Sequence, residues 1–400
     1  MANVSSSNGL EKYPKLRFKG FSEPWETDTL GNLGTFMKGA PLSKADITDE
    51  GTPFVLYGEL YTTYGEVTHS IKRRTDKVVE PQFYSKVGDV IMPTSGETPE
   101  DIATASCIML PDVILAGDLL IYRTQKVDGR LVSFVVKNKV NKQISSVAQG
   151  KSVVHVRAEE LSKISISYPS DAEQQKILAM LELLEDKMAK QRELIEHLKK
   201  YKRGLHKRVF SSKPHWAVKP LRDIATFCGG GTPSKDVSKY WQGNIGWISS
   251  SDVQEDWIDE ISISRRITEE AIANSATKLC PKGTIAIISR VGVGKVAIMP
   301  EDLCTSQDYT NITTIDGDIT FFAYQIAHKM KIEASKTQGT AIKGVTADTI
   351  KSMEMDIPNL DEQRKIATTL QKFDHRIKHE IQLLNFLQKT KRSLLQQLFM

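Results

Sequence analysis

Apolar residues recur at alternating steps of four and three positions in two long stretches of the chain. In the first stretch these residues are Ile177, Leu181, Leu184, Met188, Ile195, Leu198 and Leu205. In the second they are Ile366, Leu370, Phe373, Ile377, Leu384, Leu387 and Leu394. Side chains with this spacing share one face of a helix, which is typical of helices that pair in a coiled coil. The pattern predicts two long helices, each with a heptad seam.

The second stretch repeats the first at a constant offset of 189 residues. The run EQQKI at residues 173–177 becomes EQRKI at residues 362–366, and Lys202-Arg203 becomes Lys391-Arg392. No gap is needed over about forty residues, so the repeat is an internal duplication, which decides how the whole fold is interpreted.

Both helix starts have the sequence of a capping box. Ser170 stands three residues before Glu173, and Asn359 stands three residues before Glu362. In such a box the first side chain caps the helix and the glutamate bonds back to the cap residue. We therefore predict helix starts at these two positions.

Polar residues interrupt the seams at equivalent places, at Gln191 and Glu380 and again at Lys202 and Lys391. Polar seam residues cost stability and commonly fix the register. If the two helices are antiparallel, we expect Gln191 and Glu380 to lie in neighbouring layers near the midpoint. The alternative is that each seam frays or faces solvent there.

The remainder of the chain forms two mixed segments, one before each helix. Strand-like runs at residues 54–56, 87–92, 119–122 and 131–136 alternate with Gly, Pro and Asp turns in the first segment. Weak similarity relates the segments, because Trp25, Leu30 and Thr35 recur in order as Trp216, Leu221 and Thr226.

These observations predict an α+β fold with a duplicated order of head and helix. It consists of two pseudo-symmetric mixed α/β globular heads separated by two long helices that pack as an antiparallel coiled coil. We place the first head at residues 1–170, the central helix at 171–212, the second head at 213–358 and the final helix at 359–400.

Composition favours a folded protein of the cytoplasm. The chain has 400 residues, 40% of them hydrophobic, and four cysteines without a Cys-x-x-Cys pair. Isolated cysteines suit a reducing compartment and argue against a disulfide framework or a zinc site. The polar N-terminus predicts no signal peptide, and no apolar run approaches the ~18 residues of a membrane span.

The basic residues gather in the helices. Residues 173–210 have a net charge of +4, residues 362–400 have +5, and the whole chain has only +5, so the rest is slightly acidic. The late helical cations fit either a solvated face beside the helix C-terminus or a contact with phosphate or a partner protein. A nucleic-acid site must then be a local basic patch.

No catalytic or metal-binding constellation emerges. The run RVGVGK at residues 290–295 lacks the spacing and the Ser/Thr of a phosphate loop, so we interpret it as a bend after a strand. His375 and His379 have metal-ligand spacing but lie off the seam, without a His-Glu-x-x-His motif. We therefore predict neither catalytic nor metal-binding residues, and no cofactor, in this chain.

Polar and basic residues beside aromatic or strand-end positions are the candidates for contact with nucleic acid. They are Lys72, Arg73, Arg74, Thr94, Ser95, Thr232, Ser234, Lys235, Ser250, Ser289, Arg290, Lys295, Gln307, Gln338, Thr340 and Lys343. Arg and Gln side chains suit base edges in the major groove, and Ser, Thr and Lys side chains suit phosphates. The alternative for each is an ordinary solvated loop.

Several motifs together resemble the DNA-specificity subunit of type I restriction-modification systems. They are the two Glu-Gln-x-Lys-Ile helix starts, the two Lys-Arg-x-Leu runs from Lys202 and Lys391, the run from Gln338 to Thr346, and Leu16-Arg17-Phe18 followed by Trp25. The resemblance covers essentially the whole chain. Residues 149–152 (QGKS) depart from the run that begins QGT at Gln338.

The resemblance implies a non-catalytic reader of double-stranded DNA. Each head would be a target-recognition domain for one half of a split, asymmetric sequence. The seam residues would form the spacer and the dock for two adenine-N6 methyltransferase subunits, which restriction/translocase subunits can join. S-adenosylmethionine, and ATP with Mg for restriction, would belong to those partners.

Two alternatives stay open. A specificity subunit of a related, fused restriction-methylation system would differ only in its partners. A protein-protein scaffold with two peptide- or protein-binding heads would show no salt-sensitive, sequence-selective affinity for DNA.

Overall fold

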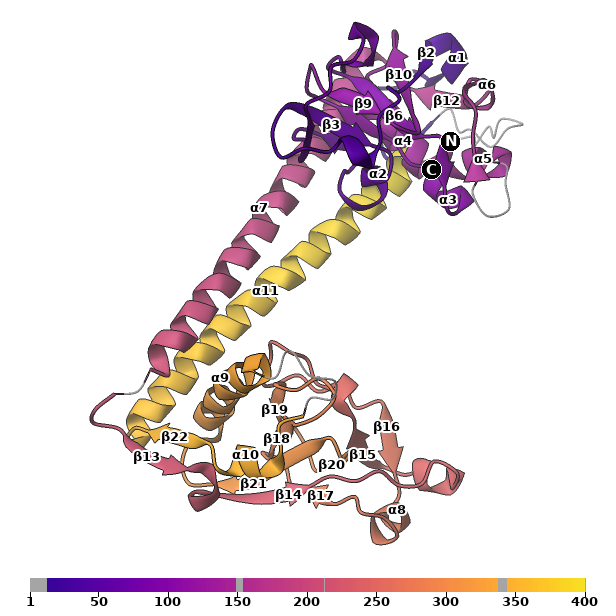
Figure 1. The fold of residues 1–400 in the computed structure, drawn as a ribbon. Coiled ribbons are helices and arrows are strands. Elements are labelled where there is room, and N and C mark those ends of the chain that lie inside the picture. Colours follow the sequence, from indigo (N-terminus) through magenta and orange to yellow (C-terminus); the bar gives the residue numbers. More distant parts are fainter. Residues whose placement is uncertain (1–12, 149–153, 212, 337–343, 400) are drawn as a thin grey trace. The chain divides into compact units, whose positions relative to one another are not determined.

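The computed structural model describes residues 13–148, 154–211, 213–336 and 344–399, and the chain divides into two compact units. Unit 1 contains residues 1–190 and 384–400, and unit 2 contains residues 191–383. Each unit has one globular head and part of each long helix, α7 (Asp171–Val209) and α11 (Leu360–Phe399) (Figure 1). The mixture of sheets and helices confirms the predicted fold class.

The head of unit 1 is built on two main sheets. The five-stranded sheet has the order β2 (Gly34–Lys38), β10 (Leu119–Thr124), β6 (Asp89–Pro93), β8 (Ser106–Ile108) and β4 (Val67–Thr68). The three-stranded sheet has the order β5 (Arg73–Thr75), β3 (Thr52–Leu56) and β9 (Ile114–Ala116). Two strand pairs complete it: β1 (Glu26–Thr29) with β12 (Ser165–Tyr168), and β7 (Ser95–Gly96) with β11 (Val154–His155). Its helices are α1 (Leu30–Leu33), α2 (Glu59–Thr62), α3 (Pro99–Ile102), α4 (Gly129–Asn138), α5 (Asn141–Val147) and α6 (Ala158–Leu161).

The head of unit 2 has two four-stranded sheets. One has the order β14 (Ala225–Gly229), β21 (Tyr309–Ile315), β18 (Ile285–Ile288) and β19 (Val296–Ile298). The other has the order β16 (Arg265–Ile267), β15 (Ile245–Ile248), β20 (Leu303–Thr305) and β17 (Leu279–Cys280). A strand pair joins β13 (Ala217–Pro220) to β22 (Glu354–Ile357). Its helices are α8 (Glu269–Ala273), α9 (Ile319–Lys336) and α10 (Ala347–Lys351).

The two heads share their central topology. The antiparallel order β2-β10-β6 in unit 1 matches β14-β21-β18 in unit 2, and the parallel pair β3–β9 matches β15–β20. Gly88 and Gly283, just before β6 and β18, both have a positive φ, of 96° and 86°. Glycine adopts this conformation without steric cost. The weak sequence similarity between the heads therefore reflects a common fold.

One predicted element was wrong. Residues 131–136 were predicted as a strand but lie within α4, where every one of them is buried. A short apolar run buried on all sides has no polar face, so periodicity cannot separate strand from helix. The Asp128 side chain caps this helix by accepting from the Arg130 amide. The runs at 54–56 and 119–122 lie in β3 and β10, and residues 89–92 of the run at 87–92 lie in β6.

The long helices pack antiparallel within each unit. In unit 1, Lys391 of α11 forms an ion pair with Glu185 of α7, and the end of α11 joins the core around the start of α7. In unit 2, Lys202 of α7 forms the equivalent ion pair with Asp374 of α11. All of the predicted apolar seam residues are buried or half-buried. The heptad pattern therefore identified the packed face correctly.

The polar interruption of the seam is a direct contact. Gln191 Nε2 donates to Glu380 Oε2 at 2.5 Å and to the Glu380 carbonyl oxygen at 3.1 Å. Both side chains are buried, and Arg376 Nε lies 2.6 Å from Glu380 Oε1. This confirms the expected proximity of Gln191 and Glu380, and excludes the alternative in which the seam frays at that place.

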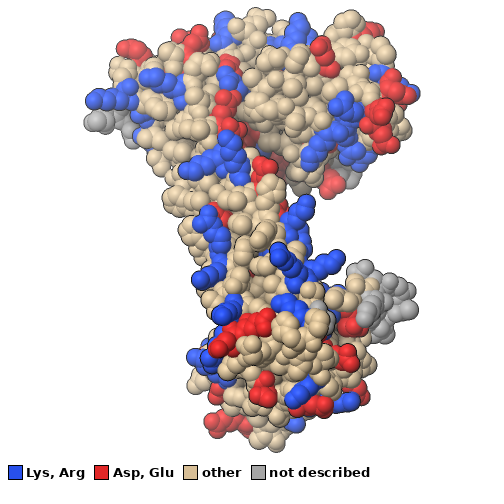
Figure 2. All heavy atoms as spheres, turned by 90° about the vertical axis from the view of Figure 1, so that its left-hand side faces the viewer, with Lys and Arg blue, Asp and Glu red and all other residues tan. Residues whose placement is uncertain are grey.

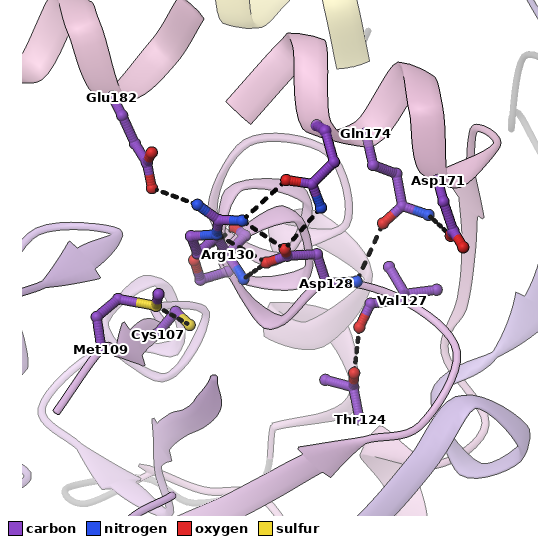
Figure 3. A network of polar contacts seen from close by, with 11 residues as sticks. Cys107, Met109, Thr124, Val127, Asp128, Arg130, Asp171, Gln174 and Glu182 are labelled. Atoms are coloured by element: carbon purple, nitrogen blue, oxygen red, sulfur yellow. Dashed lines mark hydrogen bonds and ion pairs between the residues drawn. The ribbon is translucent and has the colours of Figure 1, made fainter. Parts of the chain in front are cut away.

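A buried glutamine fastens each head to the start of its long helix, at a contact that we call the joint. In unit 1, Gln174 Oε1 accepts from the Asp128 amide at 3.0 Å and Gln174 Nε2 donates to the Pro169 carbonyl at 3.0 Å. Figure 3 shows this joint, with Arg130 between Asp128 and Glu182. In unit 2, Gln363 makes the equivalent bonds to Asp318 (2.8 Å) and Pro358 (2.9 Å).

The capping boxes differ from the prediction. Asn359 Oδ1 does accept from the Glu362 amide at 2.9 Å, as expected of a cap. The carboxylates are used elsewhere: Glu173 accepts two bonds from Arg17 at 2.8 Å, and Glu362 accepts from Trp216 Nε1 and Lys213. The charged donors Arg17 and Lys213 add a Coulomb attraction that the neutral cap amide does not offer. The glutamates therefore hold the head segments that precede β1 and β13.

Candidate nucleic-acid interface

Several loops of unit 2 leave the sheets at one edge. Strands β15 and β20 are parallel, with Ile248 opposite Thr305, so their carboxyl ends lie together. The end of β18 lies opposite Tyr309, and the end of β14 lies opposite Thr310. The loops at residues 230–244, 249–253, 289–295 and 306–308 therefore start or end side by side. We call them the second loop edge.

Unit 1 has an equivalent edge. Leu56 at the end of β3 lies opposite Ala116 of β9, and Pro93 at the end of β6 lies opposite Leu119 of β10. The loops at residues 39–51, 57–66, 94–98 and 117–118 start or end there, and we call them the first loop edge. Loops at the carboxyl ends of strands on a rigid sheet are common positions for binding residues.

Predicted residues meet at the second loop edge. Thr232 Oγ1 donates to Gln307 Oε1, which ties loop 230–244 to loop 306–308. Ser289 Oγ donates to the Asp308 carbonyl at 2.9 Å. Lys295 Nζ donates to the carbonyls of Val253 (3.1 Å) and Ser250 (3.4 Å). Four separate loops are thus fixed to each other by side chains that the sequence had singled out.

These residues differ in how free they are. Ser289 is buried, and the ammonium of Lys295 is occupied by loop carbonyls, so both residues stabilise the edge. Lys235, Arg290 and Gln307 are exposed and carry the donors of this edge that can reach outward. Ser234 is exposed as well, and its carbonyl accepts from Trp241 Nε1. Gln338, Thr340 and Lys343 lie outside the described residues, as do residues 149–152.

The first loop edge is tied in a different way. Ser95 Oγ lies 3.0 Å from His155 Nδ1 and donates to Asp118 at 3.3 Å, and Tyr61 donates to the Ser95 carbonyl at 2.7 Å. Burial raises the pKa of Tyr61, which keeps its hydroxyl protonated as a donor. Thr94 precedes this cluster and is part-buried. Ser95 is itself buried and so organises the loops.

The basic cluster of unit 1 lies on and beside β5. Arg73 Nε lies 2.8 Å from Glu59 Oε1, and Arg74 Nη1 donates to the Gly51 carbonyl at 2.8 Å. Both residues are exposed in spite of these contacts, and Lys72 beside them is exposed too. Because Arg73 lies opposite Phe54 of β3, the cluster flanks the first loop edge.

Sequence reasoning missed Arg265. Its guanidinium lies 4.7 Å from the Trp247 ring centroid, and Nη2 lies 2.5 Å from both Asp252 Oδ2 and Ser249 Oγ. Arg265 thereby braces loop 249–253 at the second loop edge. Only its place beside Arg266 in a short strand-like run could have indicated it, and that signal is weak.

The described residues contain no group of three or more His, Cys, Asp or Glu side chains able to hold a metal ion. His375 and His379 are both exposed on α11. None of the helices drawn from the described residues is long and apolar enough to cross a membrane. Figure 2 shows Lys and Arg side chains crowded over the paired helices, whereas both signs of charge intermingle over the heads.

Comparison with known proteins identifies the duplicated segment. The sequence model described as "Type I restriction modification DNA specificity domain" matches residues 22–200 and again residues 214–389. The chain belongs to this family. Each match contains one head and most of the long helix that follows it, so the duplication found in the sequence is a duplication of the family's domain.

Curated relatives carry the same description. The type I restriction enzyme MjaIX specificity subunit of Methanocaldococcus jannaschii is 36% identical over 171 residues, 41% of this chain and 39% of that protein. The EcoR124I/EcoR124II specificity subunit of Escherichia coli is 32% identical over 164 residues, 39% of this chain and 40% of that protein. This chain thus matches about two fifths of the length of each. The MjaVIII specificity subunit of M. jannaschii aligns over 92% of this chain at 19% identity.

Two solved structures share the fold. The S subunit of the type I restriction-modification system of M. genitalium matches with a TM-score of 0.60 at 16% identity, covering 97% of this chain and 99% of that one. A chain from a study of complex assembly and conformational transition of the type I R-M system matches with a TM-score of 0.59 at 16% identity, covering 93% of this chain and 96% of that one.

Proposed function

We propose that this chain is a non-catalytic specificity subunit that reads a bipartite, asymmetric double-stranded DNA sequence. One feature carries the proposal: two heads with the same central topology present loop edges with different side chains. A repeated scaffold with divergent loops suits the reading of two unlike half-sites. Each head reads one half-site through its own loop edge.

The chemistry of the exposed residues supports contact with DNA. At the second loop edge Arg290 and Gln307 are the types of side chain that read guanine and adenine in the major groove. Lys235 there, and the cluster from Lys72 to Arg74 in unit 1, suit phosphates. The buried hydroxyls of Ser95 and Ser289 hold the loops in place and do not themselves meet DNA.

We also propose that the long helices dock two adenine-N6 methyltransferase subunits, which restriction/translocase subunits can join. Large apolar side chains on the helices remain exposed beside the packed seam. In unit 1 these are Leu183 and Phe386, exposed to 71% and 64%. Large apolar side chains exposed on an otherwise polar helix surface are compatible with contact with a partner protein. S-adenosylmethionine, and ATP with Mg, bind to the partner subunits.

Adenine-methylation mapping tests the proposal. DNA is compared between cells that carry this chain with its methyltransferase partner and cells that lack only this chain. We expect a single split motif, methylated on opposite strands in its two halves. Unchanged methylation, in a complex shown to assemble, would favour the alternative of a protein-protein scaffold.

A double variant tests whether the second loop edge contacts the DNA bases. Arg290→Ala with Gln307→Ala removes two exposed donors from the second loop edge, and we expect methylation of the motif to fall at least tenfold, since each good base contact contributes ~1–3 kcal/mol. Lys282→Ala is the control, because Lys282 is exposed near the opposite end of β18. Equal methylation by both variants would remove the second loop edge from the proposal.

A further inference from the structure

Unit 2 contains a cavity of about 400 Å³, which is lined by residues other than those of the Gln363 joint. The later turns of α7, helix α9 and the loop at residues 255–258 enclose most of it. Its apolar lining includes Trp257, Ile258, Ala327 and Ile332. A space of this size accommodates a small molecule, which distinguishes it from an ordinary packing defect.

A histidine in the cavity wall lacks a hydrogen-bond partner. Among the described residues, His206 Nε2 is one of the few buried polar side-chain atoms without one. Its ring packs edge-on against Tyr324 and Phe210, with centroids 5.6 and 5.8 Å away, and lies 6.4 Å from the His328 ring. Buried polar atoms are nearly always satisfied, so an orphan beside a cavity indicates an absent partner.

The cavity rim is positively charged. Five cations, Lys199, Lys202, Arg203, Lys207 and Lys331, lie on it with two acids, Glu255 and Asp256. Two of these cations are already in ion pairs: Lys202 with Asp374, and Lys331 with Asp256 at 3.4 Å. Within the described residues Arg203 and Lys207 have no ion-pair partner. Their charge is available to an anion at the cavity mouth.

The equivalent place in unit 1 is filled. Offset 189 relates His206 to Leu395, which is buried in the core together with Phe134. Lys391, the equivalent of Lys202, lies there between Glu66 and Glu185 and over the Phe134 ring. Because the corresponding side chains of unit 1 are packed in its core, the cavity of unit 2 does not follow from the fold alone.

We propose that this cavity of unit 2 binds a small amphipathic anion, an apolar or aromatic body that carries an acidic group. The body occupies the space between Trp257 and α9 and excludes water from apolar surface. A polar atom of the ligand pairs with His206 Nε2, and the acidic group faces Arg203 and Lys207. A nucleotide and a fatty acid both have this chemistry.

A matched pair of dyes tests the site in the full-length chain. The probes are 8-anilinonaphthalene-1-sulfonate and N-phenyl-1-naphthylamine, which share the aromatic body and differ in the sulfonate. We expect saturable binding of the sulfonate at one site, about tenfold tighter than binding of the neutral dye, because charge-assisted hydrogen bonds from Arg203 and Lys207 add affinity. Equal affinity for both dyes would overturn the proposal.

Three variants test whether the sulfonate dye binds in this cavity. His206→Leu copies unit 1 and removes the unpaired Nε2, and Arg203→Glu with Lys207→Glu reverses the charge of two exposed rim residues. Each should weaken binding of the sulfonate about tenfold or more. Lys200→Glu, exposed on α7 and away from the cavity lining, should leave it unchanged. Sulfonate binding that all variants retain would overturn the proposal.

Competition then identifies the natural class. If ATP displaces the sulfonate from the parent chain but not from the rim variant, the natural ligand is a nucleotide. If dodecanoate gives that result, the natural ligand is a fatty acid. If neither displaces it, the cavity binds the dye alone and the proposal fails. Because these assays use the chain without DNA, their outcome is independent of the reader function proposed above.

Discussion

Units 1 and 2 share the glutamine joint and differ in how head and helices pack elsewhere. Gln174 and Gln363 make the same two bonds, to a proline carbonyl and to an aspartate amide of the head. Elsewhere in each unit, Leu395 and Phe134 pack in the core of unit 1, whereas their equivalents His206 and Tyr324 line a cavity in unit 2. Duplication therefore preserved the attachment of head to helix, while the packing behind it was free to diverge.

The largest expected effect comes from exchanging a whole head. Replacing residues 216–350 with the second head of another family member should change one half of the recognised sequence and leave the other half intact. The reason is that β14 to α10 form a head with its own core and loop edge. Methylation mapping reads the result. A change in both halves would contradict two independent readers.

The next largest effect is a difference in stability between variants that remove the basic partner of Glu173 and of Glu362, the carboxylates at the two helix starts. Glu173 is 1% exposed and has two bonds to Arg17, whereas Glu362 is 29% exposed beside Lys213. Arg17→Ala leaves the buried Glu173 carboxylate without its partner and should lower the free energy of unfolding by about 3–5 kcal/mol. Lys213→Ala should cost about 1 kcal/mol or less, because water solvates Glu362. Urea unfolding of both variants measures the difference.

A double variant controls for lost packing. Arg17→Ala combined with Glu173→Gln removes the uncompensated charge, so it should recover much of the stability lost in Arg17→Ala. If the double variant is no more stable than the single one, Arg17 contributes through its aliphatic contacts rather than through its charge.

The long helices were predictable because their signal is repeated and local. Nine seam positions per helix, with the polar pair Gln191 and Glu380 in register, leave little freedom for another interpretation. The segment at residues 131–136 failed because all of its side chains are buried, which removes the polar face that reveals a period. Arg265 and His206 were missed because their roles depend on residues far away in sequence.

The loop edges were predictable only in part. Small polar residues after strands marked Thr232, Ser250 and Ser289, and the structure brings their loops together. The sequence could not tell exposed Arg290 from Lys295, whose ammonium is bound to carbonyls. That difference is set by the hairpin between β18 and β19, which turns the two side chains into different surroundings.

The equivalent positions His206 in unit 2 and Leu395 in unit 1 should respond differently to acid. Burial, with Lys202, His328 and Lys331 nearby, lowers the pKa of His206 from its ordinary 6.5 to about 3. As pH falls below 6.5, His206 becomes protonated in the unfolded chain, but in the folded chain it stays neutral until about pH 3. The free energy of unfolding therefore decreases as pH falls from 6.5 to about 3. Between pH 7.5 and 5 the loss from this group is about 2 kcal/mol.

His206→Leu isolates this effect. The variant should lose about 2 kcal/mol less than the parent chain between pH 7.5 and 5 in urea unfolding, since leucine does not titrate. Leu395, its equivalent in unit 1, does not titrate, so unit 1 lacks this pH dependence at the corresponding position. An unchanged pH dependence in the variant would mean that His206 is solvated and titrates normally.

The smallest expected effect concerns Arg130 of unit 1. Its guanidinium bonds Asp128 at 2.6 Å and Glu182 at 2.7 Å (Figure 3), whereas the equivalent positions in unit 2 are Thr320 and Gln371. Since unit 2 keeps the glutamine fastening without this ion pair, Arg130→Thr should cost only about 1 kcal/mol at pH 7.

The pH dependence of that cost identifies its origin. Burial raises the pKa of Asp128, but its bonds from Arg130 outweigh burial and hold the pKa below the ordinary value of 3.8. A carboxylate with a lowered pKa stabilises the fold above its unfolded pKa and loses that contribution as pH falls through its folded pKa. The difference between the parent chain and Arg130→Thr should therefore shrink in acid. A difference that stays constant with pH would assign the cost to lost packing of the arginine stem.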